Sequence, residues 1–245
     1  MDYENLLALI KRRRSIRRYK PEPVPMETVM KVLEAARWAP SGDNSQPWEF
    51  VVVRDNAKVS QVLGILIEGS KQTRQLCPRF SFVHPERLKD VSTFIIVCAD
   101  PRFKAAYPQS QENDVLAMMY RENSGRILIE NVAIAVAHMH LAAFSLGLGT
   151  VWLTGVGESI TEQQMKKALN IPKELQLICC LPLGYPAKLP QSSVASGTRR
   201  PRPLETMVHL DGFDESKWRS DEDVAKLTQV DRHVWANFYK TGRID

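Results

Sequence analysis

Several common signatures of nucleotide, metal and hydrolase sites are missing from this sequence of 245 residues. It contains no G-x-G-x-x-G run, no P-loop, no G-x-S-x-G and no H-E-x-x-H. These absences count against a Rossmann dinucleotide domain, a P-loop nucleotidase, an α/β-hydrolase and a zinc protease of the H-E-x-x-H type. No internal repeat or low-complexity segment is present either. Any chemistry must therefore come from a different set of residues.

Cysteine is scarce, and its spacing fits neither a zinc site nor a redox pair. The four cysteines are Cys77, Cys98, Cys179 and Cys180, with no C-x-x-C among them. The last three lie in apolar runs, so we expect buried free thiols rather than disulfide bridges. His138 and His140 stand about 200° apart on a helix and cannot share a metal ion. We expect no metal site.

Long apolar runs and a basic, hydrophobic leader are also missing. No apolar run reaches about 18 residues without polar interruption, which disfavours a membrane span. The opening Met1–Asn5 does not resemble a signal peptide. With 44% hydrophobic and 25% charged residues, the composition is typical of a globular protein of the cytoplasm. We expect no membrane partner.

The charge balance is mildly basic, with a net charge of +5 and a pI near 9.0. Five arginines fall within seven positions, at 12, 13, 14, 17 and 18. This cluster is local, and no other helix repeats it with interleaved aromatic residues, so it indicates a small anionic ligand rather than nucleic acid. A basic module that binds anions or nucleic acid without a cofactor remains the alternative from another functional class.

The most informative stretch is the loop at 39–48, Ala-Pro-Ser-Gly-Asp-Asn-Ser-Gln-Pro-Trp. It follows a helical pattern over 26–38 and precedes an apolar strand pattern at 49–54. Proline and glycine restrict its backbone path. Ser41, Asn44 and Gln46 bring hydroxyl and amide groups that both donate and accept hydrogen bonds. Such a loop suits the edge of a flat heteroaromatic ring, although an ordinary polar connection has the same composition. We expect Trp48 to belong to the core.

Hydrophobic periodicity places further elements along the chain. Helices are expected at 3–12, 58–69, 125–146 and 159–169, and strands at 92–99, 150–153 and 175–183. Ser159 and Glu162 have the spacing of a capping box. Alanines and aliphatic residues surround the helix at 125–146, so both of its faces should be buried, in a core or a subunit interface. Residues 70–92 are expected to form a surface excursion, and residues 100–123 an irregular, polar insertion with a helical piece around Val115–Tyr120.

Five motifs in order make the chain resemble the nitroreductase family of FMN enzymes. They are Arg13-Arg14-Ser15-Ile16-Arg17-Arg18-Tyr19, the loop at 39–48, Leu146-Gly147-Leu148-Gly149-Thr150-Val151-Trp152, Leu183-Gly184-Tyr185-Pro186 and Arg200-Pro201-Arg202-Pro203-Leu204. The likeness spans residues 10 to about 211. It implies an α+β fold: a three-layer α/β/α sandwich with a mixed, mainly antiparallel sheet, in an obligate homodimer with FMN at the interface.

The resemblance assigns roles to the matched residues. Arg13, Ser15, Arg200 and Arg202 would hold the FMN phosphate, and Arg14 would add backbone and stem contacts. Arg17 would lie near flavin N1 and O2 and stabilise the reduced ring. From the partner subunit, Pro40, Ser41, Gly42 and Asn44 would bracket the ring and ribityl chain, and Gln46 of the same loop is a further candidate to bind the cofactor. Thr154 and Gly155 would approach N5. No protein side chain serves as a nucleophile in this family.

The implied reaction is a ping-pong transfer from NAD(P)H, through FMN, to a nitroaromatic, quinone or related small acceptor. Relatives that dehalogenate, reduce enones or degrade their own flavin keep other reactions open. Residues 100–123 would form a lid, where Tyr107, Glu112, Tyr120 and Arg121 are candidate substrate contacts. We expect an FMN domain over 1–212 and an extension over 213–245, which packs on the partner subunit through Trp235 and Phe238.

Overall fold

The computed structural model describes residues 2–76, 84–106, 114–188 and 201–228. The chain forms two compact units, Met1–Ser193 and Val194–Asp245. The elements of the first unit are α1 (Tyr3–Arg12), α2 (Met26–Arg37), β1 (Trp48–Val53), α3 (Asn56–Leu76), β2 (Thr93–Ala99), α4 (Asp114–Ser145), β3 (Gly149–Thr150), α5 (Ser159–Leu169) and β4 (Gln176–Gly184). The second unit contains α6 (Asp221–Thr228). The domain division expected after residue 212 stays a prediction.

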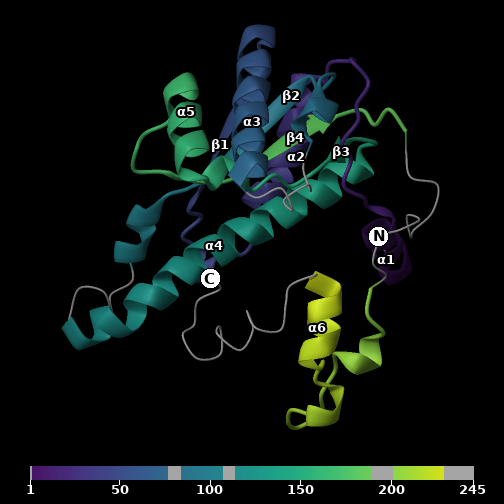
Figure 1. The fold of residues 1–245 in the computed structure, drawn as a ribbon, viewed down its shortest axis with the longest axis vertical. Coiled ribbons are helices and arrows are strands. Elements are labelled where there is room, and N and C mark those ends of the chain that lie inside the picture. Colours follow the sequence, from purple (N-terminus) through teal and green to yellow (C-terminus); the bar gives the residue numbers. More distant parts are fainter. Residues whose placement is uncertain (1, 77–83, 107–113, 189–200, 229–245) are drawn as a thin grey trace. The chain divides into compact units, whose positions relative to one another are not determined.

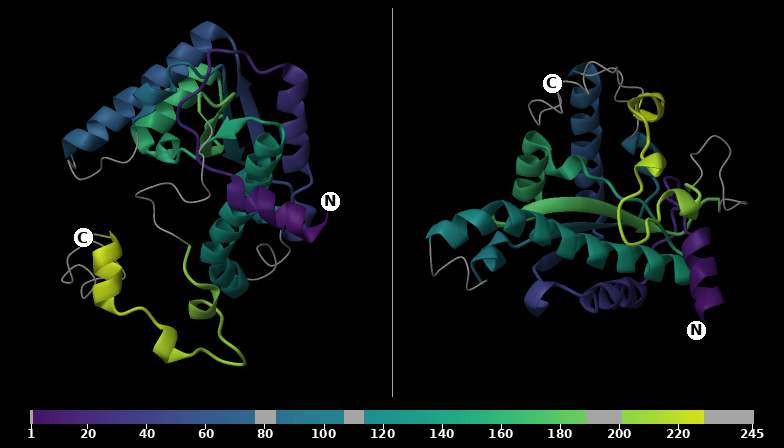
Figure 2. Two further views of the ribbon diagram at one scale, coloured as in Figure 1. Left: turned by 90° about the vertical axis from the view of Figure 1, so that its right-hand side faces the viewer. Right: turned by 90° about the horizontal axis from the view of Figure 1, so that it is seen from below.

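The first unit is a three-layer sandwich, as expected for an α+β fold of this kind. Its four strands lie in the order β1-β2-β4-β3, and each neighbouring pair is antiparallel. A parallel bridge between Ser15 and Thr150 extends the pairing beyond β3. Helices α3 and α5 cover one face of the sheet, and α2 and α4 cover the other (Figures 1 and 2).

Strand β2 is buried along its whole length because both faces of the sheet are covered. Side chains alternate between the faces of a strand. Ile95 and Val97 accordingly pack in the core with α2 and α4, whereas Phe94 and Ile96 pack in the core with α3 and α5. Trp48 belongs to the α2–α4 core, as predicted. The cysteines Cys98, Cys179 and Cys180 are buried free thiols, also as predicted, and Cys77 lies outside the described residues.

Helix α4 differs most from the sequence-based expectation. It begins at Asp114 and runs for 32 residues, so the helical piece expected around Val115–Tyr120 is confirmed, but it continues without a break into the helix expected from residue 125. Ala, Leu, Met, Arg and Glu in this stretch are strong helix formers. Their periodicity is obscured because Val115, Met118 and Met119 are apolar yet exposed. Residues 107–113 lie outside the described part of the chain.

Only one face of α4 is buried by this chain. Leu128, Val132, Val136 and Met139 pack in the core with α2, whereas Ile129 is 51% exposed. The expectation that both faces are buried is therefore not met within one copy. Met118–Ser145 is long and apolar enough to cross a membrane. Core helices of globular proteins meet the same two criteria, so this is weak evidence for a membrane span.

Two other boundaries also differ. Helix α3 continues to Leu76, so the first part of the expected excursion at 70–92 is helical. Glu158, rather than Ser159, is the N-cap of α5, and the predicted capping box does not form. Glu162 instead accepts hydrogen bonds from the backbone N–H of Leu177 at 3.2 Å and from the Lys166 ammonium at 2.8 Å. Spacing alone could not reveal these competing partners.

Candidate functional site

The basic segment that follows α1 lies against the end of the sheet. Ser15 forms a parallel bridge with Thr150, and the Ile16 N–H donates to the Thr150 carbonyl at 2.9 Å. Glycine at 149 permits this approach, because a Cβ there would lie 2.6 Å from Ile16 Cβ. Ser15 and Arg17 are exposed beside this contact.

Arg13 is half-buried and stands beside a second guanidinium, that of Arg14. Burial, followed by the positive charge of Arg14, lowers the pKa of Arg13. Arg14 Nη1 donates to the carbonyls of Lys11 at 2.8 Å and Arg13 at 2.7 Å. This guanidinium therefore provides hydrogen-bond donors for free carbonyl groups at the C-terminal end of α1. Two crowded cations at a partly dry position favour binding of an anion, because an anion offsets both their repulsion and the cost of burial.

His140 is a neighbour of this segment that sequence reasoning did not assign to the site. Its Nδ1 lies 2.5 Å from Thr150 Oγ1, and its ring lies 6.1 Å from that of Trp152. Burial and the nearby Arg13 lower the pKa of His140 to about 4. The imidazole is therefore neutral at pH 7. Among the described residues, no group of three potential ligands surrounds a metal position.

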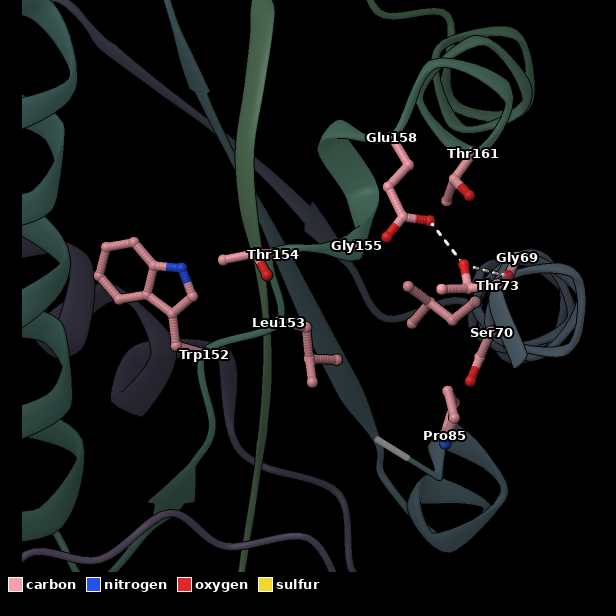
Figure 3. A pocket seen from close by; sticks show the side chains of 11 residues that line it. Gly69, Ser70, Thr73, Pro85, Trp152, Leu153, Thr154, Gly155, Glu158 and Thr161 are labelled. Atoms are coloured by element: carbon pink, nitrogen blue, oxygen red, sulfur yellow. Dashed lines mark hydrogen bonds between the residues drawn. The ribbon is translucent and has the colours of Figure 1, made fainter. Parts of the chain in front are cut away.

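The segment 150–155 leads from Ser15 to a pocket of about 140 Å³. Figure 3 shows the pocket between this segment, α3 and the start of α5. Its lining residues are Leu66, Gly69, Ser70, Thr73, Pro85, Trp152, Leu153, Thr154, Gly155, Glu158 and Thr161. The stretch 150–155 thus pairs with Ser15 at one end and lines the pocket with Thr154 and Gly155 at the other. Arg13 lies two residues before Ser15.

The loop at 41–46 has an unusual backbone held by specific hydrogen bonds. Asp43, Asn44 and Gln46 all have positive φ, between 47° and 55°, which is uncommon for residues with a Cβ. The Gly42 N–H donates to Asn131 Oδ1 at 3.1 Å, and the Gln46 N–H donates to Ser41 Oγ at 3.0 Å. Asn131, on α4, was also missed from sequence. Such a constrained loop fixes where its polar groups point.

Pro40, Ser41, Gly42, Asn44 and Gln46 do not line the pocket of their own chain. Gln46 Nε2 donates to Asn44 Oδ1 at 3.2 Å within the loop. The role expected for these residues, across a subunit interface, stays a prediction.

Arg202 belongs to the second unit, whereas Arg13 and Ser15 belong to the first. Its Nη2 donates to the Thr206 carbonyl at 2.7 Å, and the side chain borders an open hollow with Lys217 and Arg219. Arg200 lies outside the described residues, as do Tyr107 and Glu112 of the expected lid and Trp235 and Phe238 of the tail. The assignment of Arg200 and Arg202 to the phosphate therefore stays a prediction.

Comparison with known proteins decides the family. A model described as "Nitroreductase family" matches residues 10–185, which cover both the basic segment and the pocket. The chain belongs to the nitroreductase family. It is thus an oxidoreductase by family, and the resemblance based on its motifs is confirmed.

Relatives within the nitroreductase family have diverse names. An iodotyrosine deiodinase from Thermotoga neapolitana is 32% identical over 74% of this chain and 88% of its own length. A 5,6-dimethylbenzimidazole synthase from Rhodospirillum rubrum is 27% identical over 82% of this chain and 93% of its own. The solved structure of an FMN-dependent nitroreductase from Clostridium difficile R20291 has a TM-score of 0.59 and 25% identity, and the match covers 84% of this chain and 99% of that one. The shared family therefore does not specify the reaction.

Proposed function

We propose that this chain is an FMN-dependent oxidoreductase that uses NAD(P)H to reduce nitroaromatic, quinone or related electron-poor acceptors by a ping-pong mechanism. The observation that supports it best is that the segment 150–155 pairs with Ser15, next to the half-buried Arg13, at one end and lines the pocket with Thr154 and Gly155 at the other. One end of this stretch suits an anion, and the other borders a cavity with room for the ring of an acceptor. A cavity of about 150 Å³ accommodates a benzene-sized group.

The residues present fit FMN. Forked guanidinium donors such as Arg13 bind a phosphate with both charge and geometry, and the exposed Ser15 hydroxyl can add a donor. Arg202 and Arg200 would complete the phosphate site. When bound, FMN supplies the electron and hydride transfer. The chain's own contribution is to bind and orient the cofactor: the backbone near Thr154 and Gly155 fixes the ring edge, and Arg17 provides positive charge where negative charge develops.

A homodimer is part of the proposal. Apolar side chains on α1, α2 and α4 remain exposed in one copy, among them Leu6, Met30 and Ile129. Helix α1 has no buried residue at all. A second copy that covers these helices would bury them and bring its 41–46 loop to the cofactor. The cytoplasm suits this enzyme, since its described cysteines are free thiols and cytosolic NAD(P)H is the expected donor.

A reductive dehalogenase is the second candidate, because the Thermotoga neapolitana relative is named iodotyrosine deiodinase. Of the four expected substrate contacts, Tyr120 lies on α4 and is 36% exposed, and Arg121 follows it in the same helix. Turnover of a halogenated phenol with release of halide, and no turnover of nitroaromatics, would favour this candidate.

The decisive experiment is an absorbance spectrum of the purified protein before and after anaerobic addition of NADH or NADPH. We expect a flavin band that bleaches with the preferred donor and returns when a nitroaromatic or quinone is added. The variant Arg13→Ala should bind FMN at least tenfold more weakly, since a charge-assisted hydrogen bond contributes about 1.5–3 kcal/mol. Arg12→Ala is the matched control, because Arg12 is an exposed neighbour with the same charge.

A colourless protein that takes up no added FMN would contradict the proposal. Binding to polyanions that weakens steeply with salt would then support the alternative, a basic binding module.

A further inference from the structure

Among the described residues that line the pocket, Glu158 is the one with a charged side chain. It occupies the N-cap position of α5 but makes no side-chain capping bond. Its carboxylate turns toward α3 instead, where Glu158 Oε2 lies 3.2 Å from Thr73 Oγ1 (Figure 3). Asp, Asn, Ser and Thr are the usual N-caps, so a glutamate here is not explained by helix capping.

The carboxylate has little compensation from its neighbours. The Thr73 hydroxyl has one hydrogen and faces two acceptors, Glu158 Oε2 and the Gly69 carbonyl at 3.0 Å. Within the described residues, no basic group lies within salt-bridge distance of Glu158, and Arg74 on the flank of the pocket is paired with Glu86 at 3.1 Å. The pocket therefore carries a local negative charge, although the chain as a whole is basic.

This charge also lies beside the positions expected to orient the flavin. The nearest described atom to a Cβ built on Gly155 is Glu158 Oε1, at 3.8 Å. The carboxylate thus stands over Gly155, at one end of the pocket. Glu158 is exposed in one copy of the chain, so water partly screens its charge, but a unit charge on a ligand bound at this distance still interacts favourably with it if positive and unfavourably if negative.

We infer that Glu158 determines specificity: the pocket favours ligands that carry an ammonium or amidinium group next to the reducible ring, and it disfavours carboxylates. Reduction of the bound ring rests on the proposed function, whereas the preference for cations follows from the charge of the pocket itself. This preference concerns the electron acceptor, whose identity follows neither from the family nor from the fold.

The test compares the wild-type protein with Glu158→Gln, which keeps the size of the side chain and an oxygen that can accept from Thr73. Calorimetry on the FMN-loaded, oxidised protein would measure binding of benzylammonium and benzoate, two ligands that cannot be reduced. We expect the wild-type protein to bind benzylammonium at least tenfold more tightly than benzoate, and Glu158→Gln to lose that preference. Steady-state kcat/KM for 4-nitrobenzylammonium and 4-nitrobenzoate should change in parallel, with 4-nitrobenzyl alcohol nearly unaffected.

Glu130→Gln is the matched control. Glu130 is an exposed residue of α4 that is paired with Arg126 at 3.5 Å, and its substitution changes the net charge by the same amount. This control should keep the full preference. If the wild-type protein shows no preference, or if Glu130→Gln and Glu158→Gln lose it equally, the inference is wrong. Absence of flavin and of turnover would contradict the proposed function instead, and the calorimetric comparison on the protein without flavin would still decide the role of Glu158.

Discussion

At the scale of single residues, His140 shows how the site depends on contacts between distant parts of the sequence. Neither its spacing from His138 nor its apolar surroundings reveals that Nδ1 lies 2.5 Å from Thr150 Oγ1 and that Arg13 is near. The pattern of arginines predicted an anion site, which stays a prediction, but it did not indicate the neutral imidazole beside it. That imidazole follows from burial, which only the fold determines.

His140 leads to a prediction about pH. Its pKa is about 4 in the folded protein, against an ordinary value near 6.5, so the unfolded chain takes up the proton first as the pH falls. Its contribution to the free energy of unfolding is therefore complete above about pH 6.5 and is lost between about pH 6.5 and 4. The loss is at most about 3 kcal/mol.

Urea unfolding at pH 7.0 and at pH 4.5 would measure this loss in the free energy of unfolding. His140→Gln should lose less stability across this range than the wild-type protein, because glutamine does not titrate. His84→Gln, at a histidine whose side chain is 41% exposed, is the control for removing a histidine elsewhere in the chain. Equal pH dependence in the His140→Gln and wild-type proteins would contradict the assignment.

At the scale of elements, hydrophobic patterns predicted helices and strands well where one face meets a core. Strand β2 and helix α2 appear at nearly the expected bounds. The patterns indicated a helical piece around Val115–Tyr120 but not its continuity with the rest of α4, where exposed apolar residues blur the period. They also failed where a long-range partner competes for a side chain, as Leu177 does for Glu162. The 41–46 loop, with its positive φ values, has a contact that sequence could not reveal, because the Gly42 N–H donates to Asn131, which is far away in sequence.

The contact between the basic segment and β3 provides a prediction at this scale. A Cβ at Gly149 would lie 2.6 Å from Ile16 Cβ and also within 3 Å of both of its γ-carbons, so the two chain segments would have to separate. Gly149→Ala should lower the free energy of unfolding by about 1–3 kcal/mol. It should also weaken FMN binding, since Ser15 would be displaced from Thr150.

Gly64→Ala is the control, because no atom lies within 4 Å of its added Cβ inside α3. Alanine is favoured over glycine within a helix, so this variant should gain about 0.5–1 kcal/mol. Combining Gly149→Ala with Ile16→Gly, which also removes the Cβ at position 16, should restore FMN affinity if the clash is the cause. Full affinity in Gly149→Ala alone would show that the contact does not position Ser15.

At the scale of the whole molecule, the apolar side chains left exposed on α1, α2 and α4 determine the last prediction. Met30 and Ile129 are each 51% exposed, on two helices that cover the same face of the sheet. If a second copy covers this face, the double variant Met30→Glu/Ile129→Glu should be monomeric in analytical ultracentrifugation, since each buried carboxylate would lack a partner. Because the 41–46 loop would come from that second copy, the monomer should also lose FMN. Ile160→Glu is the matched control: Ile160 is 56% exposed on α5, in the opposite helix layer, so this variant should remain a yellow dimer. A monomeric wild-type protein that binds FMN tightly would show instead that the site is complete within one chain.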